Sequence, residues 1–206
     1  MRELIPLPED MRAALRAAYA SPPRAYHHFG HVESVLGHFD AVAGGPGWHR
    51  PREAWLAVLY HDAVYDAGRR DNEVRSAAMA ADAIARWLPD EGLDVEHVVH
   101  LVELTARHGT LVPAGLGEGP DGDDRRHFLD CDMAILGADA VEFDAYDRAI
   151  AEEFRDAVPG WLYRLNRRRF LRGLLRRERI YLSDFFHARL DAAARGNLRR
   201  ALGVAA

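Results

Sequence analysis

Several residue types are rare or missing in this sequence. Its 206 residues include a single cysteine, Cys131, which excludes an internal disulfide bond and a zinc site built from thiolates. Lysine and glutamine are absent, so all 27 basic residues are arginine. No stretch approaches the roughly 18 consecutive apolar residues of a membrane-spanning helix, and the first residues lack the apolar core of a secretory signal. We therefore expect a cytoplasmic protein without membrane contacts, in which His, Asp or Glu would hold any metal ion.

The composition suits one globular domain. Hydrophobic residues make up 49% of the chain and charged residues 29%, and we predict a single domain over residues 1–206. The net charge of −5 conceals an asymmetry. Residues 160–206 contain 12 arginines and three acidic residues, a balance of +9, so residues 1–159 carry −14. An acidic body with a basic end is not typical of a general nucleic-acid-binding protein.

The hydrophobic pattern is helical almost throughout. Apolar residues recur at spacings of three and four, as at Val95, Val98 and Val102, and no segment alternates β-branched with polar residues. Pro51 suits a first helical position, and Asp139 suits an N-cap. Glycine and proline separate the periodic segments. We predict an all-α bundle with helices over residues 9–19, 27–43, 51–66, 72–87, 94–107, 123–136, 139–156, 161–178 and 184–202.

Histidines gather in two short segments that carry most of the chemistry. In the first, His27 and His31 are four residues apart and would share a helical face. The second is the pair His61-Asp62, at the end of an apolar run. Burying an imidazole and a carboxylate there is unfavourable unless each has a partner. A structural ion pair would supply partners, and so would a divalent cation bound to both side chains.

A cation between adjacent helical residues needs further ligands, because neighbouring side chains on a helix diverge by about 100°. His31 is a candidate from an earlier helix, and Asp130 and Asp132 are alternatives from a later one. Three clusters of His or Asp within apolar helices favour a metal site or a set of perturbed catalytic groups over isolated ion pairs.

The order His, His-Asp and distant Asp resembles the HD superfamily of metal-dependent phosphohydrolases. The similarity is to a group of predicted phosphohydrolases of comparable length, and it extends over nearly the whole chain. The segments that carry it are residues 24–31, 61–66, 72–77, 105–108, 129–137, 180–181 and 194–198. The resemblance implies an HD-domain helical bundle with a metal-binding core over about residues 24–137 and additional C-terminal helices over about residues 139–206.

The resemblance also implies roles for individual residues. The metal ligands would be His31, His61, Asp62 and Asp132. Two further residues would lie beside the ligands and orient them: Asp130 and Tyr26. The substrate phosphate would contact Arg24, His27 and His108. The catalytic residues would be Asp66 and Glu73.

Asp66 follows the His-Asp pair by four residues, which is about one helical turn. It would act as a general acid or base, or it would have a structural role at the end of its helix. Related enzymes that act on guanosine tetraphosphate carry a glutamate where this chain has Tyr65. That difference argues against guanosine tetraphosphate as the substrate.

The implied function is metal-assisted hydrolysis of a phosphate or pyrophosphate bond in a nucleotide-like small molecule. Two imidazoles and two carboxylates suit one divalent transition metal ion, namely manganese, iron, nickel, cobalt or zinc. Two other interpretations stay open: a non-catalytic nucleotide- or metal-sensing HD module, and an HD-type di-iron oxygenase. A second metal ion would draw its ligands from His97, His100, His108 and His127.

Eight arginines lie between residues 164 and 179, interleaved with apolar residues. This pattern is typical of an amphipathic helix with a solvated face. The face could instead pair with the acidic body or with a second subunit in a homo-oligomer. Binding of RNA or polyphosphate through guanidinium groups is a further alternative.

Overall fold

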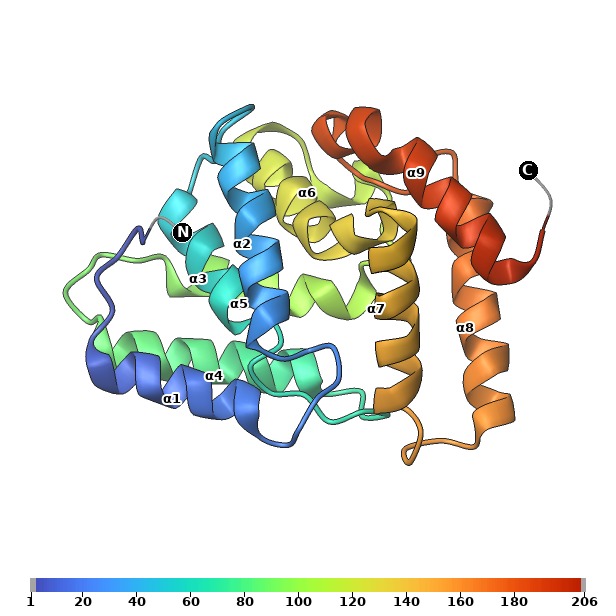
Figure 1. Cartoon of the computed structure of the whole chain (residues 1–206). Helices are drawn as coiled ribbons and strands as arrows, with labels where there is room; N and C mark the ends of the chain where they lie inside the picture. The colour runs from blue at the N-terminus through green and yellow to red at the C-terminus, as the bar shows by residue number, and fades with distance from the viewer. Residues whose placement is uncertain (1–2, 205–206) are drawn as a thin grey trace.

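The computed structural model describes residues 3–204, which fold into helices and connecting turns with no strand among them (Figure 1). The prediction of an all-α fold is confirmed. The α-helices are α1 (Glu9–Ala20), α2 (Phe29–Ala43), α3 (Pro51–Tyr60), α4 (Asn72–Trp87), α5 (Val95–Leu104), α6 (Gly119–Met133), α7 (Ala140–Glu153), α8 (Gly160–Leu175) and α9 (Asp184–Leu202). Three short 3-10 helices are η1 (Thr105–Arg107), η2 (Pro113–Leu116) and η3 (Ala134–Gly137).

Two of the predicted helix starts are confirmed in detail. Pro51 opens α3, where its missing N–H removes no helical hydrogen bond. The Asp139 carboxylate caps α7 by accepting hydrogen bonds from the N–H groups of Val141 and Glu142. At the start of α2 the boundary differs, because His28 is the N-cap and accepts from the N–H of Gly30.

The predicted helix over residues 51–66 was wrong over residues 61–66, because α3 ends at Tyr60. Side chains from α4 take the backbone N–H groups that a longer helix would have used. The N–H of Val64 donates to the Ser76 hydroxyl, and the N–H of Asp66 donates to the Asn72 side chain. His61, Asp62 and Asp66 therefore lie in a turn held by the next helix.

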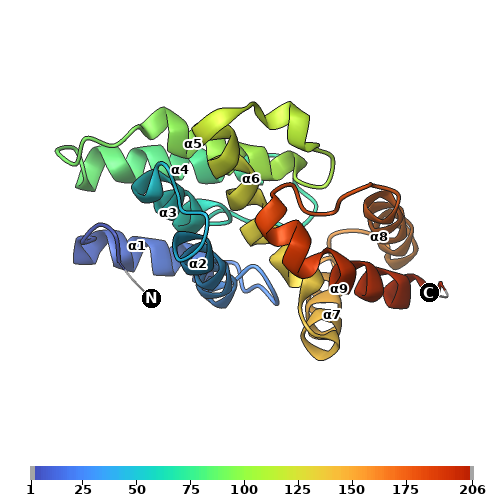
Figure 2. The same cartoon turned by 90° about the horizontal axis from the view of Figure 1, so that it is seen from above.

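The buried hydrophobic residues form one cluster that draws on every helix from α1 to α9. Within it, α3 packs against α2 on one side and against α4 and α5 on the other (Figure 2). All ten residues of α3 except the first three are buried, which explains its almost continuous apolar run. None of the helices described in residues 3–204 combines the length and the apolar character needed to cross a membrane.

The C-terminal helices pack beside this bundle. In Figure 1, α7 and α8 run in opposite directions, joined by the turn at their lower ends, and α9 crosses above them. Helix α9 packs closely against η3 at Gly137, where an added Cβ would lie 2.7 Å from the Cβ of Leu190. A glycine is therefore required for this approach. The contact joins the end of α6, and thus the segment around Asp132, to the C-terminal helices.

Candidate metal centre

Four predicted ligands converge at one point in the bundle. His31 comes from α2, His61 and Asp62 from the turn after α3, and Asp132 from α6. One ligand atom from each lies within 4.8 Å of all the others, and no other group of this kind occurs among residues 3–204. Both imidazoles are buried, whereas the two carboxylates keep some exposure. The predicted set of four is thus brought together as a cluster that can hold a metal ion.

The separations within this cluster fit the coordination shell of a small divalent cation. The Nε2 atoms of His31 and His61 are 3.0 Å apart. Each also lies between 3.2 and 3.6 Å from the nearest oxygens of Asp62 and Asp132. Ligands about 2.1 Å from an ion at right angles to one another would be separated by about 3.0 Å, and tetrahedral ligands by about 3.4 Å. Two nitrogens and two oxygens at these distances form a mixed donor set that suits a transition metal.

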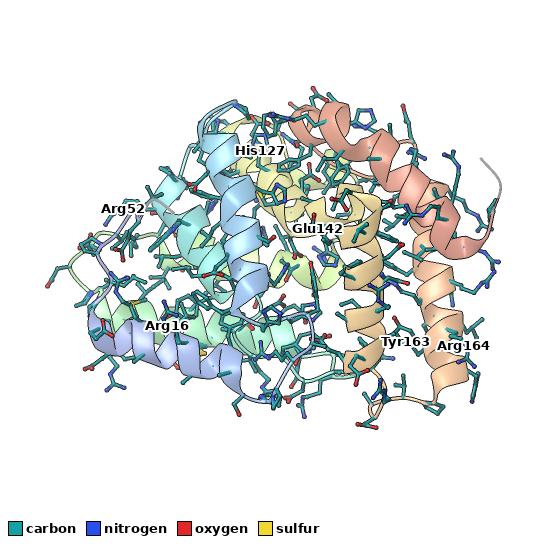
Figure 3. All side chains as sticks on the ribbon, viewed as in Figure 1. Arg16, Arg52, His127, Glu142, Tyr163 and Arg164 are labelled. Carbon is teal, nitrogen blue, oxygen red and sulfur yellow. The ribbon has the colours of Figure 1, made fainter. Side chains whose placement is uncertain are left out.

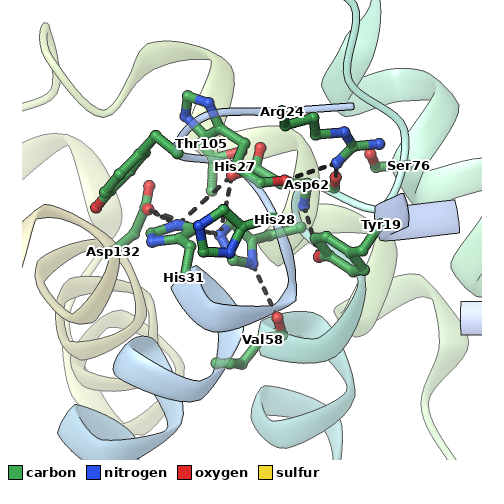
Figure 4. A network of polar contacts seen from close by, with 12 residues as sticks. Tyr19, Arg24, His27, His28, His31, Val58, Asp62, Ser76, Thr105 and Asp132 are labelled. Atoms are coloured by element: carbon green, nitrogen blue, oxygen red, sulfur yellow. Dashed lines mark hydrogen bonds and ion pairs between the residues drawn. The ribbon is translucent and has the colours of Figure 1, made fainter. Parts of the chain in front are cut away.

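Backbone groups fix the direction of the ligands (Figure 4). The Nδ1 atom of His61 lies 2.8 Å from the carbonyl oxygen of Val58, to which it donates, and this leaves Nε2 free for the cluster. The Tyr19 hydroxyl donates to the carbonyl of Leu59 at 3.0 Å and accepts from the N–H of Asp62 at 3.3 Å. Tyr19 therefore holds the turn that carries both ligands.

Arg24 has a different role from the predicted one. Its guanidinium donates to four backbone carbonyls, at distances of 2.6 to 3.0 Å. The four acceptors belong to Ala18, His27, Asp62 and Ala63. The group is thereby committed to tying the end of α1 and the segment before α2 to the turn after α3. We correct its assignment from a phosphate ligand to a residue that positions the His-Asp turn.

Protons on the cluster's side chains offset part of the negative charge of its two carboxylates. A bound cation would take the place of those protons. Burial opposes protonation of His61, but the neighbouring Asp62 carboxylate outweighs it and raises the pKa of His61 to about 9. Burial lowers the pKa of His31. For Asp132, burial favours the neutral acid, yet hydrogen bonds with His108 and His31 hold its pKa well below the usual range. A metal ion would therefore displace a proton from His61 and bind ionised carboxylates.

His108 follows η1 and lies beside the cluster, as the prediction of a phosphate contact requires. Its Nδ1 is 2.9 Å from the second oxygen of Asp132. Burial would lower the pKa of His108, but the bond to Asp132 and the charges of Asp62 and Glu73 raise it on balance. His108 thus orients a ligand, and the neighbouring carboxylates favour the protonated form of its ring.

His27 is held next to the cluster by a residue that the sequence did not indicate. Its Nδ1 is 2.6 Å from a carboxylate oxygen of Glu153, at the end of α7, and the other oxygen accepts from the N–H groups of Tyr26 and His27. The His27 ring stacks on Tyr65 with centroids 4.0 Å apart. Because α2 begins only at Phe29, the predicted common helical face of His27 and His31 was wrong, although their rings are 5.8 Å apart.

Asp130 faces away from the cluster, so its predicted role in orienting the ligands was wrong. Its carboxylate accepts hydrogen bonds from the N–H groups of Leu182 and Ser183 and from the Ser183 hydroxyl, all at 2.6 to 2.7 Å. Ser183 in turn caps α9 by accepting from the N–H of Phe186. Of the two alternatives, Asp132 therefore belongs to the cluster, and Asp130 anchors the C-terminal helices.

The other predicted site residues differ in how close they lie to the ligand cluster. Tyr26 packs on the His31 ring, with centroids 4.8 Å apart, as expected of a residue beside the ligands. Asp66 forms an ion pair with Arg75 at 2.7 Å, both side chains being about 40% exposed. Glu73 lies in the first turn of α4, and its charge contributes to raising the pKa of His108. The catalytic roles of Asp66 and Glu73 stay predictions.

The histidines that could have supplied a second metal site are dispersed. None of the four belongs to the cluster of metal-ligating side chains in residues 3–204. His108 contacts the ligand Asp132, whereas the other three lie elsewhere: His97, His100 and His127. His127 is buried between the rings of Trp48 and Phe185. Cys131 is buried, and burial raises the pKa of its thiol, as expected of a small apolar residue in the core.

A cavity of about 330 Å³ opens beside the cluster. Its inner wall consists of Tyr26, His27, His108 and Asp132. The opposite wall comes from α7, α8 and the turn between them, which is the region that the resemblance treats only as an extension. Helical periodicity alone did not mark those residues, because apolar side chains facing a cavity and apolar side chains facing the core follow the same pattern.

Comparison of the chain with protein-family models, with curated proteins and with solved structures found no match, so the site described above rests on its own residues and their geometry.

Proposed function

We propose that the protein is a hydrolase of phosphate esters that depends on one divalent transition metal ion. The observation that carries this proposal is the convergence of His31, His61, Asp62 and Asp132 within 4.8 Å of one another, at the wall of a cavity. The resemblance of the motif order to HD phosphohydrolases supports phosphate esters as the substrate class. The donor set supports manganese, iron, cobalt, nickel or zinc.

When bound, the ion would supply a Lewis acid that lowers the pKa of water and polarises a phosphoryl oxygen. The chain's own groups bind and orient the ester. His108 keeps its Nδ1 on Asp132. When the ring is protonated, a form that the neighbouring carboxylates favour, its Nε2–H can donate to a phosphate oxygen. His27, held by Glu153, lines the same cavity and supplies a second contact. Apolar side chains of α7 and α8 line the remaining sides of the cavity and would cover the rest of the ester.

The test is release of inorganic phosphate from a panel of phosphomonoesters, assayed with and without Mn²⁺, Co²⁺, Ni²⁺ or Zn²⁺. We expect turnover that requires the ion and falls by at least about 100-fold in Asp62→Asn, the order expected when a metal ligand or its orientation is lost. Asp82→Asn is the matched control, because Asp82 is exposed on α4 and outside the cluster. Tight binding of the esters with no phosphate release under any ion would contradict the proposal.

A further inference from the structure

The cavity beside the metal centre has an unusually apolar outer wall. Helix α7 contributes Ile150, the turn after it contributes Phe154 and Val158, and α8 contributes Tyr163 and Phe170. The Phe154 and Tyr163 rings lie against each other, with centroids 5.6 Å apart. A volume of about 330 Å³ is near the lower end of the range of about 300–1,000 Å³ for small-molecule sites. The wall is suited to one compact apolar group.

The position of Phe170 depends on the segment that carries His108. A Cβ built on Gly109 would lie 2.5 Å from the Phe170 ring, so the absence of a side chain there lets the ring close over the backbone beside His108. The apolar wall thus begins beside His108, whose ring contacts the ligand Asp132. An ester whose phosphate reaches the centre would have its alcohol portion against α7 and α8.

The basic side chains that line this cavity each have an acidic partner. Arg167 is paired with Asp147 at 2.8 Å and stacks on the Tyr146 ring. His27 is paired with Glu153, and His108 with Asp132. A chain of several phosphates would bring charges that these paired groups do not neutralise, and burying unpaired charge is unfavourable. The charge balance therefore fits one phosphate at the metal centre and disfavours nucleoside triphosphates.

One polar atom in the outer wall has no partner among residues 3–204. The Tyr163 hydroxyl is buried without a hydrogen bond, and Tyr163 lines the cavity. Figure 3 shows Tyr163 on the side of α8 that faces α7, whereas Arg164 points away from it. A buried hydroxyl without a partner costs free energy that a ligand group can recover. The far end of the bound group is thus expected to carry a hydrogen-bonding substituent.

We propose that the substrate is the phosphomonoester of an aromatic or similarly bulky apolar alcohol, whose ring lies between α7 and α8 with a polar substituent directed to Tyr163. This inference rests on the proposed function and narrows it. In the reaction, the oxygen of water forms a bond to phosphorus and the bond from phosphorus to the alcohol oxygen breaks. A proton from that water ends on the alcohol oxygen, and the products are the alcohol and inorganic phosphate.

The first test compares 2-naphthyl phosphate, glycerol 3-phosphate, AMP and ATP in the metal-loaded wild type. We expect the lowest KM for the naphthyl ester, by at least about tenfold, because only it fills the apolar wall. In Phe170→Ala the KM for the naphthyl ester rises by about the same factor, several times more than the KM for glycerol 3-phosphate. Leu165→Ala, on the exposed face of α8, is the matched control and leaves both substrates unchanged. A preference for ATP, or an equal loss for all esters in Phe170→Ala, would overturn the inference.

A second test uses binding, so that it does not depend on turnover. Calorimetry with 2-naphthylphosphonate and with its 6-hydroxy derivative measures the Kd of each in metal-loaded wild type and in Tyr163→Phe. We expect Tyr163→Phe to weaken only the hydroxylated ligand, by about fivefold to tenfold, as for one lost hydrogen bond. Binding of both ligands without phosphate release from any ester would refute the proposed function but leave the inferred pocket intact. Absence of binding, or an equal effect on both ligands, would refute the pocket.

Discussion

Asp130 and Asp132 are two residues apart on α6. In the structure Asp130 anchors the C-terminal helices, whereas Asp132 belongs to the ligand cluster, and alanine substitutions of the two residues distinguish these roles. Asp130→Ala would leave the N–H groups of Leu182 and Ser183 without their acceptor. Water cannot readily replace it, because both residues are only about 5% exposed. An unsatisfied buried donor costs about 1–3 kcal/mol, so two cost about 2–6 kcal/mol. Part of this is offset, because burial raises the pKa of Asp130 to about 7 and makes its ionised form unfavourable.

We therefore expect Asp130→Ala to lower the free energy of unfolding by about 3 kcal/mol, a large part of the roughly 5–15 kcal/mol typical of a domain. For a chain of this size, the melting temperature would fall by about 6–12 °C. The assay is urea unfolding of the metal-free protein followed by circular dichroism. Metal content is measured on the same samples, well below the transition.

The metal measurement distinguishes the two carboxylates. Asp130→Ala should keep one ion per folded chain, whereas Asp132→Ala should lose it, because only Asp132 lies in the ligand cluster. The reasoning is refuted if Asp130→Ala changes stability by less than about 1 kcal/mol, the cost of even one stranded donor. It is equally refuted if Asp130→Ala loses the ion while Asp132→Ala retains it.

Three further predictions concern residues around the centre. Arg24→Lys keeps the positive charge but should weaken metal binding at least about tenfold, because a lysine ammonium cannot reach the four carbonyls that the guanidinium joins. An unchanged Kd in a metal titration would contradict this. Glu153→Gln should raise the KM for phosphate esters about tenfold while leaving metal content at the wild-type value, since it loosens His27 but no ligand; lost metal would show a structural role instead. Burial lowers the pKa of His127. Below about pH 6.5 the unfolded chain therefore binds a proton at this residue more readily than the folded chain does, and the free energy of unfolding should fall as the pH drops. His127→Phe should flatten that slope between pH 7 and 5, and identical slopes in urea unfolding would refute the assignment.

Helix periodicity predicted the fold class and most helix positions, because each helix buries an apolar stripe that sequence spacing records. It failed after Tyr60, where α3 stops although the sequence up to Asp66 continues the pattern. The cause is not local. Asn72 and Ser76 reach back from α4 and take N–H groups of the turn, which nothing in residues 61–66 indicates.

The metal ligands were predictable because histidines and aspartates are unusual in apolar helices. The choice between Asp130 and Asp132 was not settled by the residues themselves. Two residues on a helix point about 200° apart, so only one of them faces the centre, and the pattern around them is apolar on both sides. The decisive fact is the turn at residues 182–183, which satisfies Asp130 from 52 residues away.

The outer part of the site was not predictable from sequence. Glu153 belongs to a pair of glutamates on an ordinary amphipathic helix, and only the packing of α7 brings it to His27. Arg167 is one of eight arginines between residues 164 and 179, and most of its neighbours in that run are exposed. Only the structure distinguishes Arg167, which lines the cavity, from Arg164, which is exposed and does not.

The most direct test of the account is the stoichiometry of metal binding. Protein stripped of metal is titrated with Mn²⁺ by calorimetry, in the wild type, in His61→Ala, in Asp132→Ala and in the control Asp82→Asn. The account predicts one ion per chain in the wild type and the control, none in the two cluster variants, and release of protons on binding because His61 must deprotonate. One ion per chain with unchanged affinity in both His61→Ala and Asp132→Ala would contradict it.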